Sequence, residues 1–149
     1  MGCIFFSRIL EMKGVLILAW FLACSVPAVP GSLLDLSSMI EDVTGKPALE
    51  SFGFYGCYCG WGGKGTPVDA IDWCCWWHDV CYAELERKGY NVLTQSYRYR
   101  VRQGLVTCEL GSHCQMELCA CDQKLVHCLK RNRRSYSSLY QYFPNFLCI

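Results

Sequence analysis

The chain has 149 residues, with 14 Lys and Arg against 13 Asp and Glu, so its formal net charge is +1. This length fits one domain, and a net charge so close to zero argues against nucleic acid as a ligand. The 13 cysteines predict a disulfide-rich domain made in the oxidising secretory route.

The first 31 residues have the pattern of a secretory signal peptide. Arg8 and Lys13 precede an apolar run at 14–29, which stops at small residues that end with Gly31. The run is about 16 residues long, shorter than the ~20 that a membrane span needs. We expect cleavage after Gly31 and secretion, although an uncleaved anchor remains an alternative.

Cleavage after Gly31 leaves one predicted domain at residues 32–149. Met12 is an alternative start of the chain. The chain contains no Asn-x-Ser/Thr acceptor, so N-glycosylation is not expected.

The mature domain begins with a predicted amphipathic helix at 32–43. Leu33, Leu36 and Ile40 recur at helical spacing, with polar residues opposite. A segment rich in glycine and proline follows at 51–67 and predicts an irregular loop.

Two longer helices and a hairpin are predicted beyond this loop. Residues 69–87 and 115–132 have helical periodicity. Between them, apolar and basic residues alternate over 97–107 around a Gln-Gly break, which predicts a short β-hairpin. The tail at 135–149 is aromatic and lacks a helical period.

Cysteine spacing indicates how the two long helices meet. Cys74 and Cys81 are seven residues apart, as are Cys121 and Cys128, so each pair lies on one helix face. Pairing Cys74 with Cys128 and Cys81 with Cys121 fits antiparallel helices, whereas parallel helices would need the other pairing.

The same spacing brings a histidine and a carboxylate together. His78 lies one turn from both Cys74 and Cys81, so it faces the other helix. Asp122 follows Cys121 directly. The antiparallel arrangement therefore predicts that His78 faces Asp122.

Two segments carry a resemblance to a known family. YGCYCGWGG at 55–63 and CCWWHDVCY at 74–82 resemble the calcium loop and active-site helix of secreted phospholipases A2, most closely the group V branch. The resemblance covers nearly all of 32–149. It implies a mainly α, disulfide-rich fold with two long antiparallel helices cross-linked by disulfides, an amphipathic N-terminal helix, a calcium loop and a small β wing.

The resemblance implies one Ca²⁺ as cofactor. Its ligands would be the backbone carbonyls of Tyr58, Gly60 and Gly62 and the carboxylate of Asp79. This set is chemically reasonable, because Ca²⁺ takes oxygen ligands and glycine lets several carbonyls turn toward one point.

The resemblance also implies a reaction, the hydrolysis of the sn-2 ester of glycerophospholipids to a free fatty acid and a lysophospholipid. His78 would be the general base, oriented by Asp122 with the support of Tyr82 and Tyr97. The Gly60 amide would bind the developing oxyanion. No serine lies in a G-x-S-x-G motif, which argues against the ordinary lipase route.

Membrane contact is expected near the N-terminal helix and the loop. Leu33, Leu36 and Ile40 resemble the acyl-channel lining of the family, although an apolar helical stripe is as often core. Trp61 in the glycine loop is the expected contact with the phospholipid surface. The basic cluster at 130–134 is either a solvated helix end or a site for heparan sulfate, anionic lipid or a receptor.

The cysteine count departs from the family. Removal of 1–31 also removes Cys3 and Cys24, which leaves an odd number. The partner of Cys114 in the family falls where this chain has Tyr90, so we expect a free thiol in a loop, on a monomer or a Cys114-linked dimer. The resemblance pairs the others as Cys57–Cys148, Cys59–Cys75, Cys74–Cys128, Cys81–Cys121 and Cys108–Cys119.

Two other function classes remain open. The family's fold also occurs as a noncatalytic receptor- or membrane-binding module, but only where the metal-binding Asp or the His is replaced, and here Asp79 and His78 are both present. The other is a disulfide-framed peptide ligand without a metal. Calcium-induced thermal stabilisation would separate it from an enzyme.

Overall fold

The computed structural model describes residues 4–12, 15–23 and 31–149. Strands β1 (Ile4–Met12) and β2 (Val15–Ala23) form an antiparallel hairpin. These strands are not among the predicted elements. The predicted signal peptide spans this hairpin together with 24–30, and the residues just before the expected cleavage point lie outside the described residues. The signal peptide thus stays a prediction.

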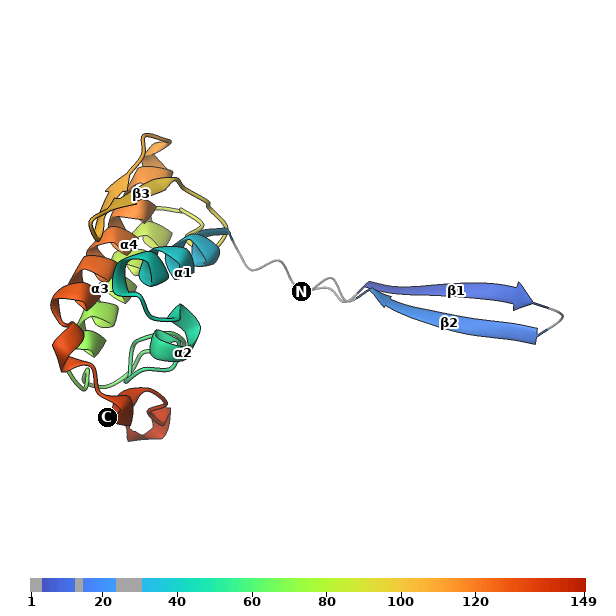
Figure 1. Cartoon of the computed structure of the whole chain (residues 1–149), viewed down its shortest axis with the longest axis horizontal. Helices are drawn as coiled ribbons and strands as arrows, with labels where there is room; N and C mark the ends of the chain where they lie inside the picture. The colour runs from blue at the N-terminus through green and yellow to red at the C-terminus, as the bar shows by residue number, and fades with distance from the viewer. Residues whose placement is uncertain (1–3, 13–14, 24–30) are drawn as a thin grey trace.

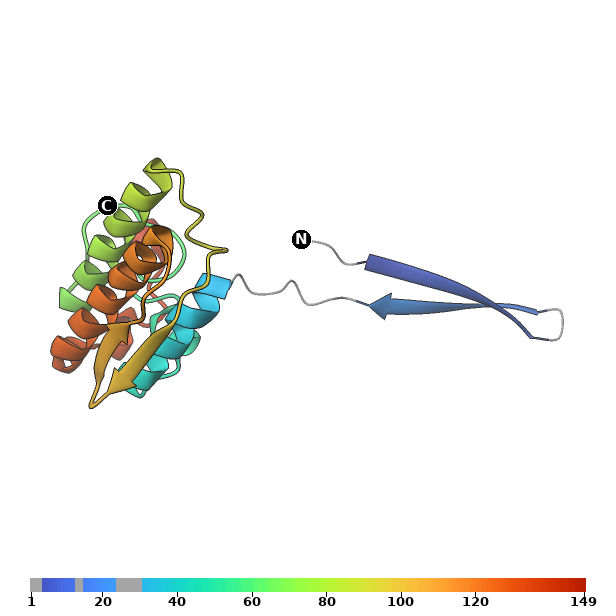
Figure 2. The same ribbon diagram turned by 90° about the horizontal axis from the view of Figure 1, so that it is seen from above.

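The rest of the chain is mainly helical, as predicted. Helices α3 (Ala70–Arg87) and α4 (His113–Arg131) lie side by side, and α1 (Gly31–Thr44) packs against α4 (Figures 1 and 2). Among the described residues, no helix combines the length and the apolar composition needed to cross a membrane.

Side-chain caps define where the two long helices begin. Asp69 precedes α3 and accepts a hydrogen bond of 2.9 Å from the Asp72 amide. Ser112 and Gln115 form a capping box, which starts α4 at His113 rather than at Gln115 as predicted. One prediction is therefore wrong, because the earlier start puts Cys114 in the first turn of α4 and not in a loop.

The predicted hairpin is present as strands β3 (Tyr99–Arg102) and β4 (Leu105–Cys108). Gln103 and Gly104 form its turn with positive φ angles of 51° and 72°. Two positive φ values match the right-handed twist of the strands, which explains why the chain reverses there.

Several short elements were not expected from the sequence. Helix α2 (Ala48–Phe52) includes the first two residues of the segment predicted as an irregular loop at 51–67. The tail, in which no helical period is visible, contains the short 3-10 helices η1 (Arg133–Ser135), η2 (Ser138–Tyr140) and η3 (Asn145–Leu147). All four are too short to show a periodic apolar face.

The core lies between α1, α3 and α4. Met39 of α1, Ile71 of α3 and Leu118, Val126 and Leu129 of α4 are almost completely buried. Among the residues described, five disulfides supplement this modest core. They are the pairs that the resemblance implied: Cys57–Cys148, Cys59–Cys75, Cys74–Cys128, Cys81–Cys121 and Cys108–Cys119.

Candidate active site

His78 and Asp122 face each other across the two long helices. The His78 Nε2 atom lies 2.6 Å from Asp122 Oδ1, and both side chains are buried. The disulfides Cys74–Cys128 and Cys81–Cys121 join the same helices on either side of this pair. Antiparallel packing and two cross-links therefore fix the imidazole against the carboxylate.

Two tyrosines complete the surroundings of Asp122. The Tyr82 hydroxyl donates to Asp122 Oδ1 at 2.6 Å, and the Tyr97 hydroxyl donates to Oδ2 at 2.5 Å. Burial, followed by the charge of the Asp122 carboxylate, raises the pKa of both tyrosines well above the ordinary value. Both hydroxyls consequently remain donors at neutral pH.

The tautomer of His78 follows from these contacts. A carboxylate can only accept hydrogen bonds, so Nε2 carries the proton and Nδ1 carries a lone pair. No side chain or backbone group of the described residues hydrogen-bonds to Nδ1. This nitrogen is free to accept a proton from a water molecule.

The loop that begins at Cys57 has a backbone that requires glycine. Gly60, Gly62 and Gly63 have φ angles of 85°, 104° and 141°. A Cβ at Gly60 would lie 1.7 Å from the Gly53 carbonyl oxygen, so no larger residue fits there. Glycine thus allows this segment to curve with its peptide groups exposed.

Asp79 reaches this loop from α3. A Cβ built on Gly63 would lie 3.5 Å from Asp79 Oδ2, which places the carboxylate next to the loop backbone. Burial raises the pKa of Asp79 to about 6, and the Asp72 charge adds to the effect while His78 opposes it. A partly buried carboxylate that forms no ion pair with another described residue is a suitable ligand for a metal ion.

The donor set fits calcium. Within the described ranges no three His, Cys, Asp or Glu side chains gather into a metal site, so a cation here would need backbone oxygens. The carbonyl oxygens of Tyr58, Gly60 and Gly62 accept no hydrogen bond from any residue described. One carboxylate and several free carbonyls form the hard oxygen set that Ca²⁺ prefers.

The predicted lipid-contact residues have different surroundings. Ile40 is buried in the core, and Leu36 packs against the core while partly buried. Leu33 is partly buried, whereas the neighbouring Leu34 is 52% exposed. Trp61 is 79% exposed on the glycine loop, as expected for a residue that contacts a membrane.

Asp72 is the residue that the sequence reasoning missed. Its carboxylate is completely buried beneath the glycine loop and accepts hydrogen bonds from the backbone of that loop. An acidic residue in the first turn of a helix is ordinarily explained by the helix dipole, so no sequence signal distinguished it.

Comparisons with known proteins agree with this geometry. Residues 33–141 match the family model described as Phospholipase A2. The chain is 71% identical over 137 residues to the human protein "Phospholipase A2 group V", covering 92% of this chain and 99% of the relative. It is 67% identical over 137 residues to the mouse protein of the same name, and the match covers 92% of this chain and 100% of that relative.

A more distant relative comes from a viper. "Basic phospholipase A2 DsM-S1" of Daboia siamensis is 44% identical over 129 residues, covering 87% of this chain and 93% of the relative. The chain belongs to the phospholipase A2 family. Its disulfide-linked helices and its buried His–Asp pair agree with these matches. The identity to the human and mouse group V proteins places it in the group V branch. The chain is accordingly an enzyme that hydrolyses phospholipids.

Proposed function

We propose that His78 is the general base in the hydrolysis of the sn-2 ester. Its Nδ1 removes a proton from a water molecule, whose oxygen attacks the ester carbonyl carbon. Asp122 holds the ring in the required tautomer, and Tyr82 and Tyr97 hold Asp122. The proton then passes to the departing glycerol oxygen, which gives a free fatty acid and a lysophospholipid.

The observation that carries this proposal is the buried His78–Asp122 pair with an unengaged Nδ1. The Gly60 amide, which makes no hydrogen bond to another described residue, would donate to the oxyanion. Removing such a donor typically costs about 10²–10³-fold in rate.

We propose Ca²⁺ as the cofactor, held by the Tyr58, Gly60 and Gly62 carbonyls and by Asp79. When bound, it polarises the ester carbonyl and neutralises the substrate phosphate. The protein supplies the rigid glycine loop and the single carboxylate that set its position. We expect a dissociation constant of about 10⁻⁴–10⁻³ M, which is the range of extracellular calcium modules.

Release of fatty acid from zwitterionic vesicles tests both proposals. Hydrolysis should require calcium and stop on chelation. Asp79→Lys should lose calcium binding and turnover together, because its ammonium occupies and repels the cation site. Activity that survives chelation, or calcium affinity retained in Asp79→Lys, would contradict the proposed site.

We further propose that the enzyme is secreted, loses residues 1–31 and acts at a phospholipid surface through Trp61. The apolar pattern at 14–29 and the exposure of Trp61 support this proposal. Amino-terminal sequencing of secreted protein checks the processing, with Ser32 as the expected first residue.

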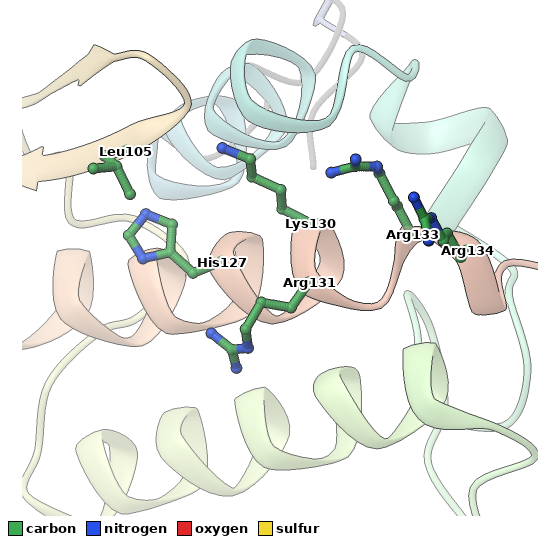
Figure 3. A pocket seen from close by; sticks show the side chains of 6 residues that line it. All are labelled: Leu105, His127, Lys130, Arg131, Arg133 and Arg134. Carbon is green, nitrogen blue, oxygen red and sulfur yellow. The ribbon is translucent and has the colours of Figure 1, made fainter.

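A second candidate function concerns the end of α4. Leu105, His127 and four basic residues line a surface pocket there (Figure 3). None of the four basic side chains forms an ion pair with a carboxylate among the described residues. The basic residues are Lys130, Arg131, Arg133 and Arg134.

This pocket supports binding of a sulfated polysaccharide such as heparan sulfate, whose charges would meet unpaired cations. Retention on a heparin column should fall in Arg133→Glu, with Arg98→Glu, at an exposed position that does not line the pocket, as a charge-matched control. Equal loss in both variants would indicate an effect of net charge and no specific site.

A further inference from the structure

The carboxylate of Asp72 accepts hydrogen bonds from both ends of the glycine loop. Its Oδ1 accepts from the amides of Tyr58 and Cys59 at 2.8 and 3.3 Å, and its Oδ2 accepts from those of Cys57 and Val68 at 2.7 and 2.9 Å. One buried side chain therefore joins the start of the loop to its end.

Asp72 also links the loop to the helix that bears Asp79. The two residues are seven positions apart on α3, so about two helical turns separate them. The helix is a rigid element, and it sets the distance between the Asp79 carboxylate and the loop backbone at Tyr58. The Asp79 carboxylate and the loop carbonyls of the proposed calcium site are thus both positioned by α3.

A neighbouring glycine leaves room for this contact. Gly56 has a φ angle of 60°, and a Cβ there would lie 2.5 Å from the Asp72 carboxyl carbon. Any side chain at 56 would consequently displace the carboxylate from the amides that it holds.

We infer that Asp72 is a positioning residue for calcium, an inference that rests on the proposed function. By accepting from the Cys59 amide, which shares one peptide plane with the Tyr58 carbonyl, it fixes the orientation of that carbonyl, one of the proposed calcium ligands. Residues that orient metal ligands typically change metal affinity about 10–100-fold when replaced. Asp72 does not touch substrate.

Asp72→Asn tests the inference directly. An amide has only one accepting oxygen, so two of the four N–H groups lose their hydrogen bond to this side chain whichever way it is oriented. We expect the calcium dissociation constant, measured by calorimetric titration of the whole protein, to rise about tenfold or more. The kcat at saturating calcium should change far less, because His78 and Asp122 are untouched.

Gly56→Ala is the second variant, for the case in which Asp72→Asn does not fold. Its matched control is Gly45→Ala, since Gly45 has a similar φ of 71° but nothing within 4 Å of an added Cβ. Weakened calcium binding is expected in Gly56→Ala alone. Hydrogen exchange at the Cys57, Tyr58, Cys59 and Val68 amides should accelerate in the same variant.

The outcomes separate this inference from the proposed function. If Asp72→Asn and Gly56→Ala bind calcium as the unmodified protein does, while Asp79→Lys does not, the role of Asp72 is wrong and the calcium site stands. A Gly45→Ala variant as impaired as Gly56→Ala would also overturn it. If the unmodified protein binds no calcium, the proposed function fails, and this inference with it.

Discussion

His78 Nε2 and Asp122 Oδ1 lie 2.6 Å apart although 44 residues separate them in the chain. Because the contact uses Nε2, the opposite ring nitrogen is the one available for chemistry. Replacing the ring should therefore abolish the reaction without disturbing the disulfides that hold the helices.

We expect His78→Gln to fold and to lose hydrolysis by at least about 10²–10⁴-fold, the usual contribution of a general base. Fatty-acid release measures the loss, and thermal unfolding checks the fold. Tyr90→Phe, at a partly buried position with no role in the site, serves as a control with normal activity. Substantial turnover in a folded His78→Gln protein would refute the mechanism.

Trp61→Ala should weaken binding to zwitterionic vesicles by about tenfold or more, since burial of a large apolar side chain contributes ~1.5–3 kcal/mol. Vesicle sedimentation measures the affinity. Trp73→Ala is the matched control, because Trp73 is also exposed but lies on α3. A steep loss of binding with salt that is unaffected by Trp61→Ala would instead indicate the basic cluster at 130–134.

Cys114 should titrate as a single free thiol in the denatured, unreduced protein, because it is the free cysteine among the described residues. In the native state, burial and then the Glu117 carboxylate raise the pKa of this thiol, so alkylation at pH 8 should be slower than after denaturation. Cys114→Ser should show no thiol. A Cys114-linked dimer on nonreducing electrophoresis would also fit this prediction. A monomer with neither a free thiol nor an adduct on Cys114 would contradict cleavage after Gly31, because that cleavage leaves an odd number of cysteines.

The free energy of unfolding should decrease as the pH falls below about 6.5, through His127. Its Nε2 accepts a hydrogen bond of 3.0 Å from the Val106 amide, which only neutral imidazole can do. Burial, followed by Arg131 and Lys130, lowers the pKa of His127 below the ordinary 6.5.

The unfolded chain therefore binds the proton first, and stability is lost as the pH falls from 6.5 toward the lower pKa of the folded state. Urea unfolding at pH 7.5 and pH 5.5 measures this difference. In His127→Gln, which cannot titrate, the difference should be smaller. An unchanged difference in that variant would assign the pH dependence to other groups.

The long helices and the His78–Asp122 pair could be predicted because their signals are periodic. Cysteines seven residues apart mark one face of a helix, and two such pairs fix the antiparallel register. The β3–β4 hairpin was predictable for a similar reason, since alternation and a Gln-Gly turn are local features.

Other parts could not be predicted, because their causes are not local. Helix α2 is five residues long and too short to show a period. The start of α4 depends on the Ser112–Gln115 capping box, which moved Cys114 from the expected loop into a helix. The role of Asp72 depends on a loop that folds back over α3, and no spacing in the sequence reports that contact.

The chain ends against the glycine loop. Cys148 is bonded to Cys57, the Ile149 carbonyl accepts from the Thr66 amide at 3.3 Å, and a Cβ at Gly65 would lie 2.6 Å from the Ile149 nitrogen. An affinity tag fused after Ile149 would thus begin against Gly65 and Thr66, and a polyhistidine sequence there would add foreign metal ligands to the loop that carries the proposed calcium site. Recombinant protein for calcium titration is better purified without a carboxyl-terminal tag.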